Sequence, residues 1–273
     1  VSASDLNAIN ALTTEVIDLT NVTSITSSSL ADLEILGTAI LVNGEFSNAT
    51  GATTVAVSDA TIDATTLAAT IDSLDFINGL NTTLMTLASG ATINIDASEI
   101  STILGHETGS RLTISDQDIV VTGNISVDDA NLLSATTTGT VTASITTTES
   151  ITELKTLTET SNAYTIVISS ADATATAEDL SAIDGKTTAT IDATAVTSIS
   201  GTYDEVTALY ESAGVDNLGD EAISISDELT VTEANVIDGL TTGAITATIG
   251  NSRVSELVGG TPLLLSLIHI SEP

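Results

Sequence analysis

The stretch that decides the fold spans residues 179–199 and reads DLSAIDGKTTATIDATAVTSI. Residues 5–25 read DLNAINALTTEVIDLTNVTSI, and the two stretches align over their whole length without a gap. The pairs Asp-Leu, Ala-Ile, Thr-Thr and Ile-Asp and the run Val-Thr-Ser-Ile recur at the same places. Part of a third copy, IDASEISTILG at residues 95–105, aligns with residues 191–201. Such internal self-similarity is the signature of a tandem-repeat architecture.

A second family of repeats supports the same conclusion. Residues 125–145 read ISVDDANLLSATTTGTVTASI, and residues 229–249 read LTVTEANVIDGLTTGAITATI. The pairs Ala-Asn, Thr-Gly and Thr-Ala recur in gapless register. Chance does not easily place so many matches in one frame, so we treat the chain as a series of related units.

Each unit combines two kinds of short run. The first kind alternates and is rich in β-branched residues, which predicts strands of about five residues. Such runs occupy residues 16–19, 54–57, 92–95, 112–114, 141–145, 164–168, 190–194, 223–226 and 244–249. The second kind has helical spacing, with Ser or Thr before the run or Gly at its end. Helices are therefore predicted within residues 148–157, 178–185 and 202–214.

These runs predict an α/β fold. Parallel strands need a crossover of a dozen or more residues, and the helical runs supply it. We expect an elongated repeat solenoid of short parallel strands alternating with short helices, with about nine or ten rungs. It would fill residues 1–262 as a single domain, with irregular loops near residues 43–53 and 81–90. The alternative is an all-β right-handed solenoid, in which the helical runs are turns. A row of immunoglobulin-like sandwiches ranks third, because the strands are too widely spaced for hairpins.

Acidic residues dominate the charge. The 37 Asp and Glu residues stand against four Lys and Arg, for a formal net charge of −33. Such a surface repels nucleic-acid phosphates and anionic membranes, so neither is an expected partner. No run of about 18 or more uncharged apolar residues occurs, and no membrane insertion is expected. The acidic residues either solvate the surface or in part bind calcium, which is the one candidate cofactor.

The last residues of the chain differ in character from the rest. Residues 265–273 read LSLIHISEP, which looks like a translated sequencing adapter. We therefore set residues 263–273 apart as a non-native tail and expect the natural protein to continue in both directions.

The repeat resembles one found in known proteins. The stretch DLSAIDGKTTATIDATAVTSISGTYDEV, residues 179–206, is similar to a repeat of very long Thr/Ala/Asp-rich proteins of marine bacteria, cyanobacteria among them. The resemblance covers most of residues 5–260. It implies a secreted or cell-surface location, often beside haemolysin-type calcium-binding repeats. The glycine-rich nonapeptide of those companions is missing from this sequence, so the resemblance implies architecture and compartment rather than chemistry.

Two acidic segments are the candidate metal sites. One is the loop at residues 216–221, where Asp216, Asp220 and Glu221 flank a glycine; the other is the pair Asp128 and Asp129. Calcium takes six to eight oxygen ligands, and a Gly-containing acidic loop can supply several. The spacing is not that of an EF-hand, and a solvated turn before the strand at Ile223 is the preferred interpretation of the 216–221 loop.

Aspartates also recur at the ends of the predicted strands. They are Asp18, Asp59, Asp96, Asp116, Asp192 and Asp227. Each could accept hydrogen bonds from the backbone of the following turn. Stacked in a solenoid, they would form a column of like charges that divalent cations would stabilise.

No residue is predicted to be catalytic. Outside the tail the only histidine is His106, beside Glu107, and we expect it on the surface just after a helix. No zinc motif, phosphate-binding loop, dinucleotide fingerprint or nucleophile elbow occurs. The Thr pairs fall mostly at corners, not in the regular ranks along consecutive strands that an ice-binding face requires.

These observations predict a non-catalytic function. The first hypothesis is a structural or adhesive repeat segment of a large exported surface protein. Its partners would be other repeats of the same long chain, cell-surface polysaccharide or neighbouring copies. The alternatives are a surface-layer lattice protein bridged by calcium and a polysaccharide-acting solenoid enzyme. The scarcity of aromatic and basic residues argues against the enzyme.

Overall fold

The computed structural model describes residues 1–47, 54–78 and 84–250. Within these ranges the chain forms nine α-helices, and every strand pair given with its register is parallel, which confirms the α/β class. The all-β alternative is wrong, because helices such as α7 (Ala177–Asp184) and α8 (Tyr203–Glu211) are complete and side-chain-capped. The predicted tail, residues 263–273, lies outside the described ranges.

Contacts group the chain into two units, which we describe separately. The first comprises Val1–Ile125 and Asp129–Ala143, and the second comprises Ser126–Asp128 and the chain from Ser144 onward. Helix α5 (Val127–Thr136) and strand β10 (Val141–Ile145) lie at the boundary between the units. The prediction of a single solenoid domain stays a prediction.

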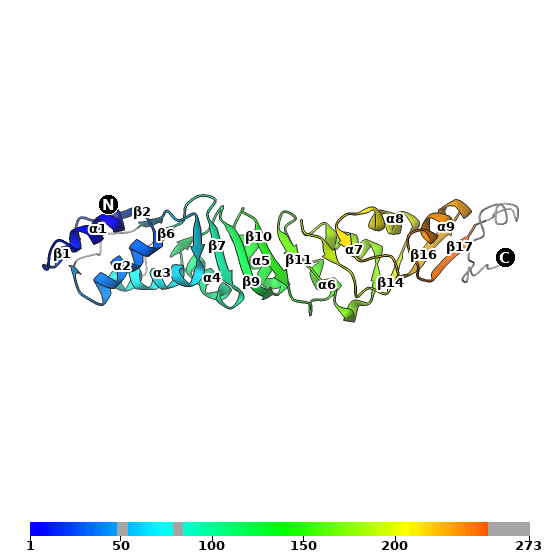
Figure 1. Ribbon diagram of the computed structural model, residues 1–273, viewed down its shortest axis with the longest axis horizontal. Helices are drawn as coiled ribbons and strands as arrows, with labels where there is room; N and C mark the ends of the chain where they lie inside the picture. Colours follow the sequence, from blue (N-terminus) through cyan, green and yellow to red (C-terminus); the bar gives the residue numbers. More distant parts are fainter. Residues whose placement is uncertain (48–53, 79–83, 251–273) are drawn as a thin grey trace. The chain divides into compact units, whose positions relative to one another are not determined.

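The first unit carries a row of helices. They are α1 (Ala3–Asn10), α2 (Leu30–Leu41), α3 (Ala64–Asn78) and α4 (Ile100–Thr108), with the short 3-10 helix η2 (Ala97–Glu99) before α4. Each α-helix packs against the next in the chain (Figure 1). Gly37 lies where α2 meets α3, because a Cβ there would come within 2.6 Å of the Ser73 hydroxyl oxygen.

Three sheets accompany these helices. One pairs β1 (Ile17–Asp18) with β3 (Phe46–Ser47). A second has the order β2 (Ser24–Ser28), β4 (Thr54–Val57), β6 (Leu84–Thr86) and β8 (Leu112–Thr113). The third places β5 (Thr61–Asp63), β7 (Thr92–Asp96) and β9 (Asp118–Ile125) in order, with β10 beside β9.

Aliphatic ladders form the core of the first unit. Ile62, Ile93 and Ile119 pair in register on β5, β7 and β9, and all three are fully buried. The four-stranded sheet of β2, β4, β6 and β8 stacks Ile25, Val55, Met85 and Leu112 in the same way. Stacking like side chains at each step buries apolar surface that a single strand would leave in water.

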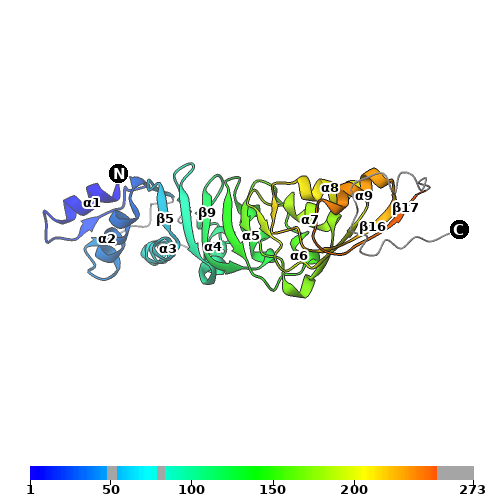
Figure 2. The same ribbon diagram turned by 45° about the vertical axis from the view of Figure 1, so that its right-hand side comes forward.

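The second unit also alternates parallel strands with helices, but with fewer residues between paired strands. Its helices are α6 (Ile151–Leu154), α7, α8 and α9 (Val231–Asp238), and each packs against the next (Figure 2). Its strands are β11 (Ala163–Thr165), β12 (Thr174–Thr176), β13 (Ile191–Asp192), β14 (Ser198–Gly201), β15 (Val215–Asp216), β16 (Ala222–Leu229) and β17 (Ile245–Ile249), and the 3-10 helix η3 (Ser170–Asp172) precedes β12.

One coil of this unit consists of two strands and a helix. Strand β13 belongs to one sheet, β14 to another, and α8 follows directly; β15, β16 and α9 repeat the succession. We use "coil" for such a succession in either unit. Strand partners lie 24 residues apart between β14 and β16, where Ile199 pairs with Ile223, and 22 residues apart between β16 and β17, where Ile223 pairs with Ile245. Ile199, Ile223 and Ile245 consequently stack in register on β14, β16 and β17.

The presence of two strands per coil corrects the prediction of one. The second strand of a coil runs straight into the N-cap of the helix, as β14 does at Thr202 and β16 at Thr230. The predicted strands at 92–95 and 223–226 lie within two such second strands, β7 and β16, whereas β14 was not predicted. The predicted strands at 54–57 and 141–145 match β4 and β10.

Two predicted loops contain strands. Strand β3 lies within residues 43–53 and β6 within residues 81–90, although residues 48–53 and 81–83 fall outside the described ranges. Phe46 and Met85 are buried in these strands. A strand of two or three residues is too short to show periodicity, so only its neighbours in the stack reveal it.

Candidate functional site

The most elaborate polar structures in the molecule lie where one coil meets the next. At residues 187–189, the Thr187 hydroxyl donates to the Tyr164 carbonyl at 2.8 Å. The same oxygen accepts from the N–H groups of Tyr164 at 2.8 Å and Ala189 at 3.1 Å. Thr188 donates its N–H to the Asn162 carbonyl at 2.9 Å. This pair of threonines, which we call a Thr-Thr corner, joins its coil to the preceding one.

The corner recurs at residues 241–243. Thr241 donates its hydroxyl to the Glu221 carbonyl at 2.7 Å, and Thr242 donates its N–H to the Gly219 carbonyl at 2.8 Å. Gly243 donates its N–H to the Thr241 hydroxyl at 2.9 Å. A Cβ at Gly243 would lie 2.2 Å from the Glu221 carbonyl oxygen, so close backbone approach requires glycine here.

The first unit contains the same arrangement at residues 137–139. The Thr137 hydroxyl donates to the Gln117 carbonyl at 2.6 Å, and Thr138 donates its N–H to the Ser115 carbonyl at 2.8 Å. The Gln117 side chain is buried and accepts from the Ser115 N–H at 2.8 Å. The Thr pairs thus fall at corners, as predicted, and they bond coil to coil there.

Glu221, one of the predicted metal ligands, is fully buried. Its carboxylate accepts from the Gly219 N–H, with both oxygens within 3.0 Å, and from the Tyr210 hydroxyl at 2.6 Å. Burial, followed by the hydrogen bond to Glu221, raises the pKa of Tyr210 well above its usual range, so the phenol stays a donor. These internal donors hold the turn that precedes β16.

The other predicted metal ligands stand apart from this carboxylate. Asp216 and Asp220 are exposed. Asp128 and Asp129 lie in the first turn of α5, where a carboxylate is favoured by the helix dipole. Over the described ranges, no group of three or more His, Cys, Asp or Glu side chains is placed to hold a metal ion. Calcium binding stays a prediction.

Acidic side chains also link coils by capping the helix of the coil before. The carboxylate of Asp59 accepts from the N–H of Leu30, the first residue of α2, at 2.8 Å. Asp227 does the same for Tyr203 of α8 at 2.9 Å. Glu149 caps Val127 of α5, and Asp172 caps Ile151 of α6. These residues satisfy N–H groups that a helix leaves unpaired at its start.

Other strand-end aspartates cap their own turns. Asp18, Asp96 and Asp192 each accept from the N–H and the hydroxyl of the residue two positions later. The hydrogen bond from the Thr194 hydroxyl is the main reason that the pKa of Asp192 lies below its usual range. The predicted capping of the following turn is therefore confirmed for these three residues. Asp59 and Asp227 instead cap helices of the coil before, and Asp116 accepts from the Ser89 hydroxyl.

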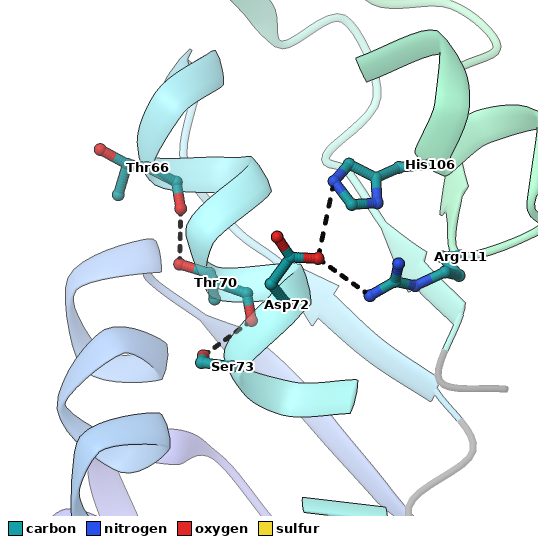
Figure 3. Close-up of polar contacts among 6 residues, drawn as sticks. All are labelled: Thr66, Thr70, Asp72, Ser73, His106 and Arg111. Carbon is teal, nitrogen blue, oxygen red and sulfur yellow. Dashed lines mark hydrogen bonds and ion pairs between the residues drawn. The ribbon is translucent and has the colours of Figure 1, made fainter. Parts of the chain in front are cut away.

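The first unit contains a small cluster of polar and charged side chains from α3, from α4 and from the segment after α4 (Figure 3). Oδ1 of Asp72 on α3 lies 3.2 Å from Nη2 of Arg111, with which it forms an ion pair. The same oxygen lies 4.0 Å from Nε2 of His106 on α4. His106 is 7% exposed, so the expectation of a surface histidine is wrong. It follows Ile103 by three residues and therefore shares the face of α4 that packs inward. The Arg111 N–H donates to the His106 carbonyl at 2.9 Å, which fixes the two residues together.

One further ion pair joins coils of the second unit. Lys155, at the end of α6, contacts Asp179 in the first turn of α7. The hydrogen bond between them is the main cause of a lowered pKa at Asp179 and a raised pKa at Lys155. Like the Thr-Thr corners, this pair lies between successive coils.

Sequence reasoning singled out Glu221 as a candidate metal ligand but did not foresee its hydrogen bonds with Tyr210 and Gly219, and it missed Gln117 and Asp72. The signal was the dipeptide Thr-Thr followed by Gly or Ala, which marks the corners at 137–139, 187–189 and 241–243 and hence the buried polar residue in the coil before each of them. No comparable signal marks Asp72, because its partners lie on another helix.

Comparison with family models, curated proteins and solved structures found no match to this chain. None of the helices in the described ranges is long and apolar enough to cross a membrane.

Proposed function

We propose that the chain is a structural or adhesive repeat segment of a large exported surface protein, built as an elongated α/β solenoid. The observation that carries the proposal is the use of the polar side chains. Thr-Thr corners, acidic helix caps and the Lys155–Asp179 pair all join one coil to the next. Polar contacts of this kind recur at junctions between successive coils in both units. They therefore stabilise a long and regular stack of coils.

The charge of the chain supports an exported role. A formal net charge of −33 keeps such a segment soluble and resists non-specific association. At the ionic strength of seawater the Debye length is only about 4 Å, so repulsion between exposed carboxylates is strongly screened. The same chain at low salt would carry a larger electrostatic cost.

Small-angle X-ray scattering of the purified chain tests the architecture. A compact globule of this length has a radius of gyration of about 18 Å. The proposal predicts a clearly larger radius, with the scattering profile of a rod. A radius near the globular value would contradict the solenoid and, with it, the structural role.

A calcium-bridged lattice is the second candidate, and one observation favours it. Asp192 and Asp216 pair in register on β13 and β15, which brings two acidic side chains onto neighbouring strands. A bound divalent cation would relieve repulsion between such carboxylates. Electron microscopy with calcium and with chelator separates the candidates: a lattice protein forms sheets only with calcium, whereas a stalk segment stays as single particles in both.

A further inference from the structure

The first coil of the first unit exposes an unusual amount of apolar surface. Ile9 of α1 is 48% exposed, Leu12 is 87% exposed and Val16 is 58% exposed. Exposed apolar side chains grouped within one coil mark a candidate interaction surface. With Thr13 and Thr14, which are also exposed, these residues form what we call the first-coil face.

The sequence repeat provides an internal control for this face. Residues 5–25 align without a gap with residues 179–199, so Ile9 corresponds to Ile183 and Ile17 to Ile191. Ile183 and Ile191 are both fully buried, whereas Ile9 is exposed and Ile17 only half-buried. The same residues in the same motif are therefore covered in one copy and uncovered in the other.

In the second copy, residues 179–199, the coil that precedes the copy covers these side chains. Helix α6 packs against α7, which carries Ile183. The chain at residues 162–168 runs beside β13: Asp192 donates its N–H to the Ile166 carbonyl at 2.9 Å, and Ile168 donates its N–H to the Asp192 carbonyl at 2.9 Å. Strands β1 and β13 each belong to a two-stranded sheet, with β3 and β15, but among the described residues β13 has in addition the parallel bridge from Val167 to Asp192.

Polar groups on the first-coil face also indicate that a preceding coil would cover it. Thr13 accepts from the Glu15 N–H at 3.0 Å, just as Thr187 accepts from Ala189. A Thr-Thr corner is therefore already folded at residues 13–15. In the described ranges no hydrogen bond joins it to a carbonyl of another coil, whereas Thr187 and Thr188 bond to Tyr164 and Asn162. The exposed corner carries the donors that a preceding coil would accept.

The backbone enters the first coil as it enters the second copy. Ser2 caps α1 through the Asp5 N–H, and Thr176 caps α7 through the Asp179 N–H. The Thr26 N–H donates to the Val1 carbonyl at 2.9 Å, so Val1 lies beside β2 in the way that β12 lies beside β14.

We propose that the first-coil face binds a strand–helix coil of the same repeat class, in the position that residues 144–174 hold before α7. The proposal rests on the proposed solenoid architecture and names the partner of one of its ends. The coil must supply two backbone carbonyls to Thr13 and Thr14 and aliphatic side chains to Ile9 and Ile17. Leu12 and Val16 stand where the second copy has Lys186 and Thr190, so the binding coil meets more apolar surface here.

A graft tests the proposal on the whole chain. Residues 144–174 are fused directly before Val1, so that Thr174 precedes Val1 as it precedes Ala175 in the native sequence. We expect a higher melting temperature and amide exchange at Thr14 slowed about 100-fold or more, since the corner N–H gains a buried partner. A second graft carrying Tyr164→Asp and Ile166→Asp in the fused copy is the matched control and is expected to give neither change.

Ile9→Asp distinguishes binding at this face from an unrelated effect of the graft. In the unfused chain the substitution leaves the melting temperature unchanged, and in the fused chain it abolishes the gain. An intact graft that leaves Thr14 exchange and the melting temperature unchanged overturns the proposal, as does a graft that fails to order. Rod-like scattering of the unfused chain would then still support the proposed function.

Self-association of the unfused chain is the remaining outcome. If sedimentation shows a dimer that Ile9→Asp dissociates, the occupant of the face is a second copy, and the proposal is overturned. Compact scattering would contradict the solenoid instead, whatever the graft does.

Discussion

Residues 5–25 and 179–199 are nearly the same sequence in two surroundings. Both copies begin a helix at a hydroxyl N-cap, Ser2 in one and Thr176 in the other. Both turn after an aspartate that caps its own turn, Asp18 or Asp192. The local structure is thus the same in both, and it follows from short-range hydrogen bonds alone.

The two copies differ in what covers them. Ile183 has no solvent exposure, whereas Ile9 is 48% exposed, and the Thr187 corner is buried while the Thr13 corner is open. The difference shows that sequence sets the conformation of a coil and that neighbouring coils supply its burial. Burial is the larger stabilising term, so equivalent substitutions should have unequal effects in the two copies.

The largest difference is expected from Ile183→Ala against Ile9→Ala. Removing the buried side chain of Ile183 leaves a cavity and should lower the free energy of unfolding by about 2–5 kcal/mol. Ile9→Ala removes exposed atoms and should cost less than about 1 kcal/mol. Urea denaturation followed by circular dichroism measures both. Equal losses would mean that the two isoleucines are equally covered in solution.

The Thr-Thr corners should give the next largest difference. Thr187→Val removes three hydrogen bonds in a buried corner and leaves the Tyr164 groups without that partner, at a cost of about 1–3 kcal/mol. Thr13→Val, at an exposed corner, should be close to neutral. Urea denaturation measures both variants. An unchanged free energy of unfolding in Thr187→Val would show that the corner does not hold the coils together.

A pair of glycines sharpens the comparison further. Gly243→Ala places a Cβ 2.2 Å from the Glu221 carbonyl oxygen and should cost about 1–3 kcal/mol through the backbone shift that it forces. Gly185→Ala meets no atom closer than 3.6 Å, and the other copy already has Ala11 at this place. Its effect should stay within about 0.5 kcal/mol. Thermal melts of the two variants compare them directly; a harmless Gly243→Ala would disprove the close approach.

The smallest effect is expected at Asp179, which corresponds to Asp5. Lys155 is the main cause of the lowered pKa at Asp179, whereas the Ser2 hydroxyl is the main cause at Asp5. A lowered pKa stabilises the fold above the unfolded value of about 3.9, and this stabilisation is lost as the pH falls through the folded value.

Lys155→Met should therefore raise the pKa of Asp179 and leave that of Asp5 unchanged. Carboxyl titration by NMR measures the two values, and added salt should reduce the difference at Asp179. An equal shift at both residues would show that the effect is not due to the contact with Asp179.

Repeats and strand-like runs in the sequence predicted the α/β class, the strands at β4 and β10 and the helices α6, α7 and α8. They predicted the second strands β7 and β16 but not β12 and β14, whose three or four residues lead directly into a helix N-cap. Nor could they show that Glu221 faces Tyr210 and Gly219, since the partners of a buried carboxylate are set by the fold around it. His106 was misplaced for the same reason: its burial depends on α3, which is distant in sequence.

Amide hydrogen exchange of the unmodified chain tests the central claim most directly. Thr14 and Thr188 occupy the same place in the two copies, but only Thr188 donates its N–H to a preceding coil, through the Asn162 carbonyl. We predict that Thr188 exchanges slower than Thr14 by several orders of magnitude, with Ile191 slower than Ile17. Equal protection of the two copies would contradict the claim that each coil is buried by the coil before it.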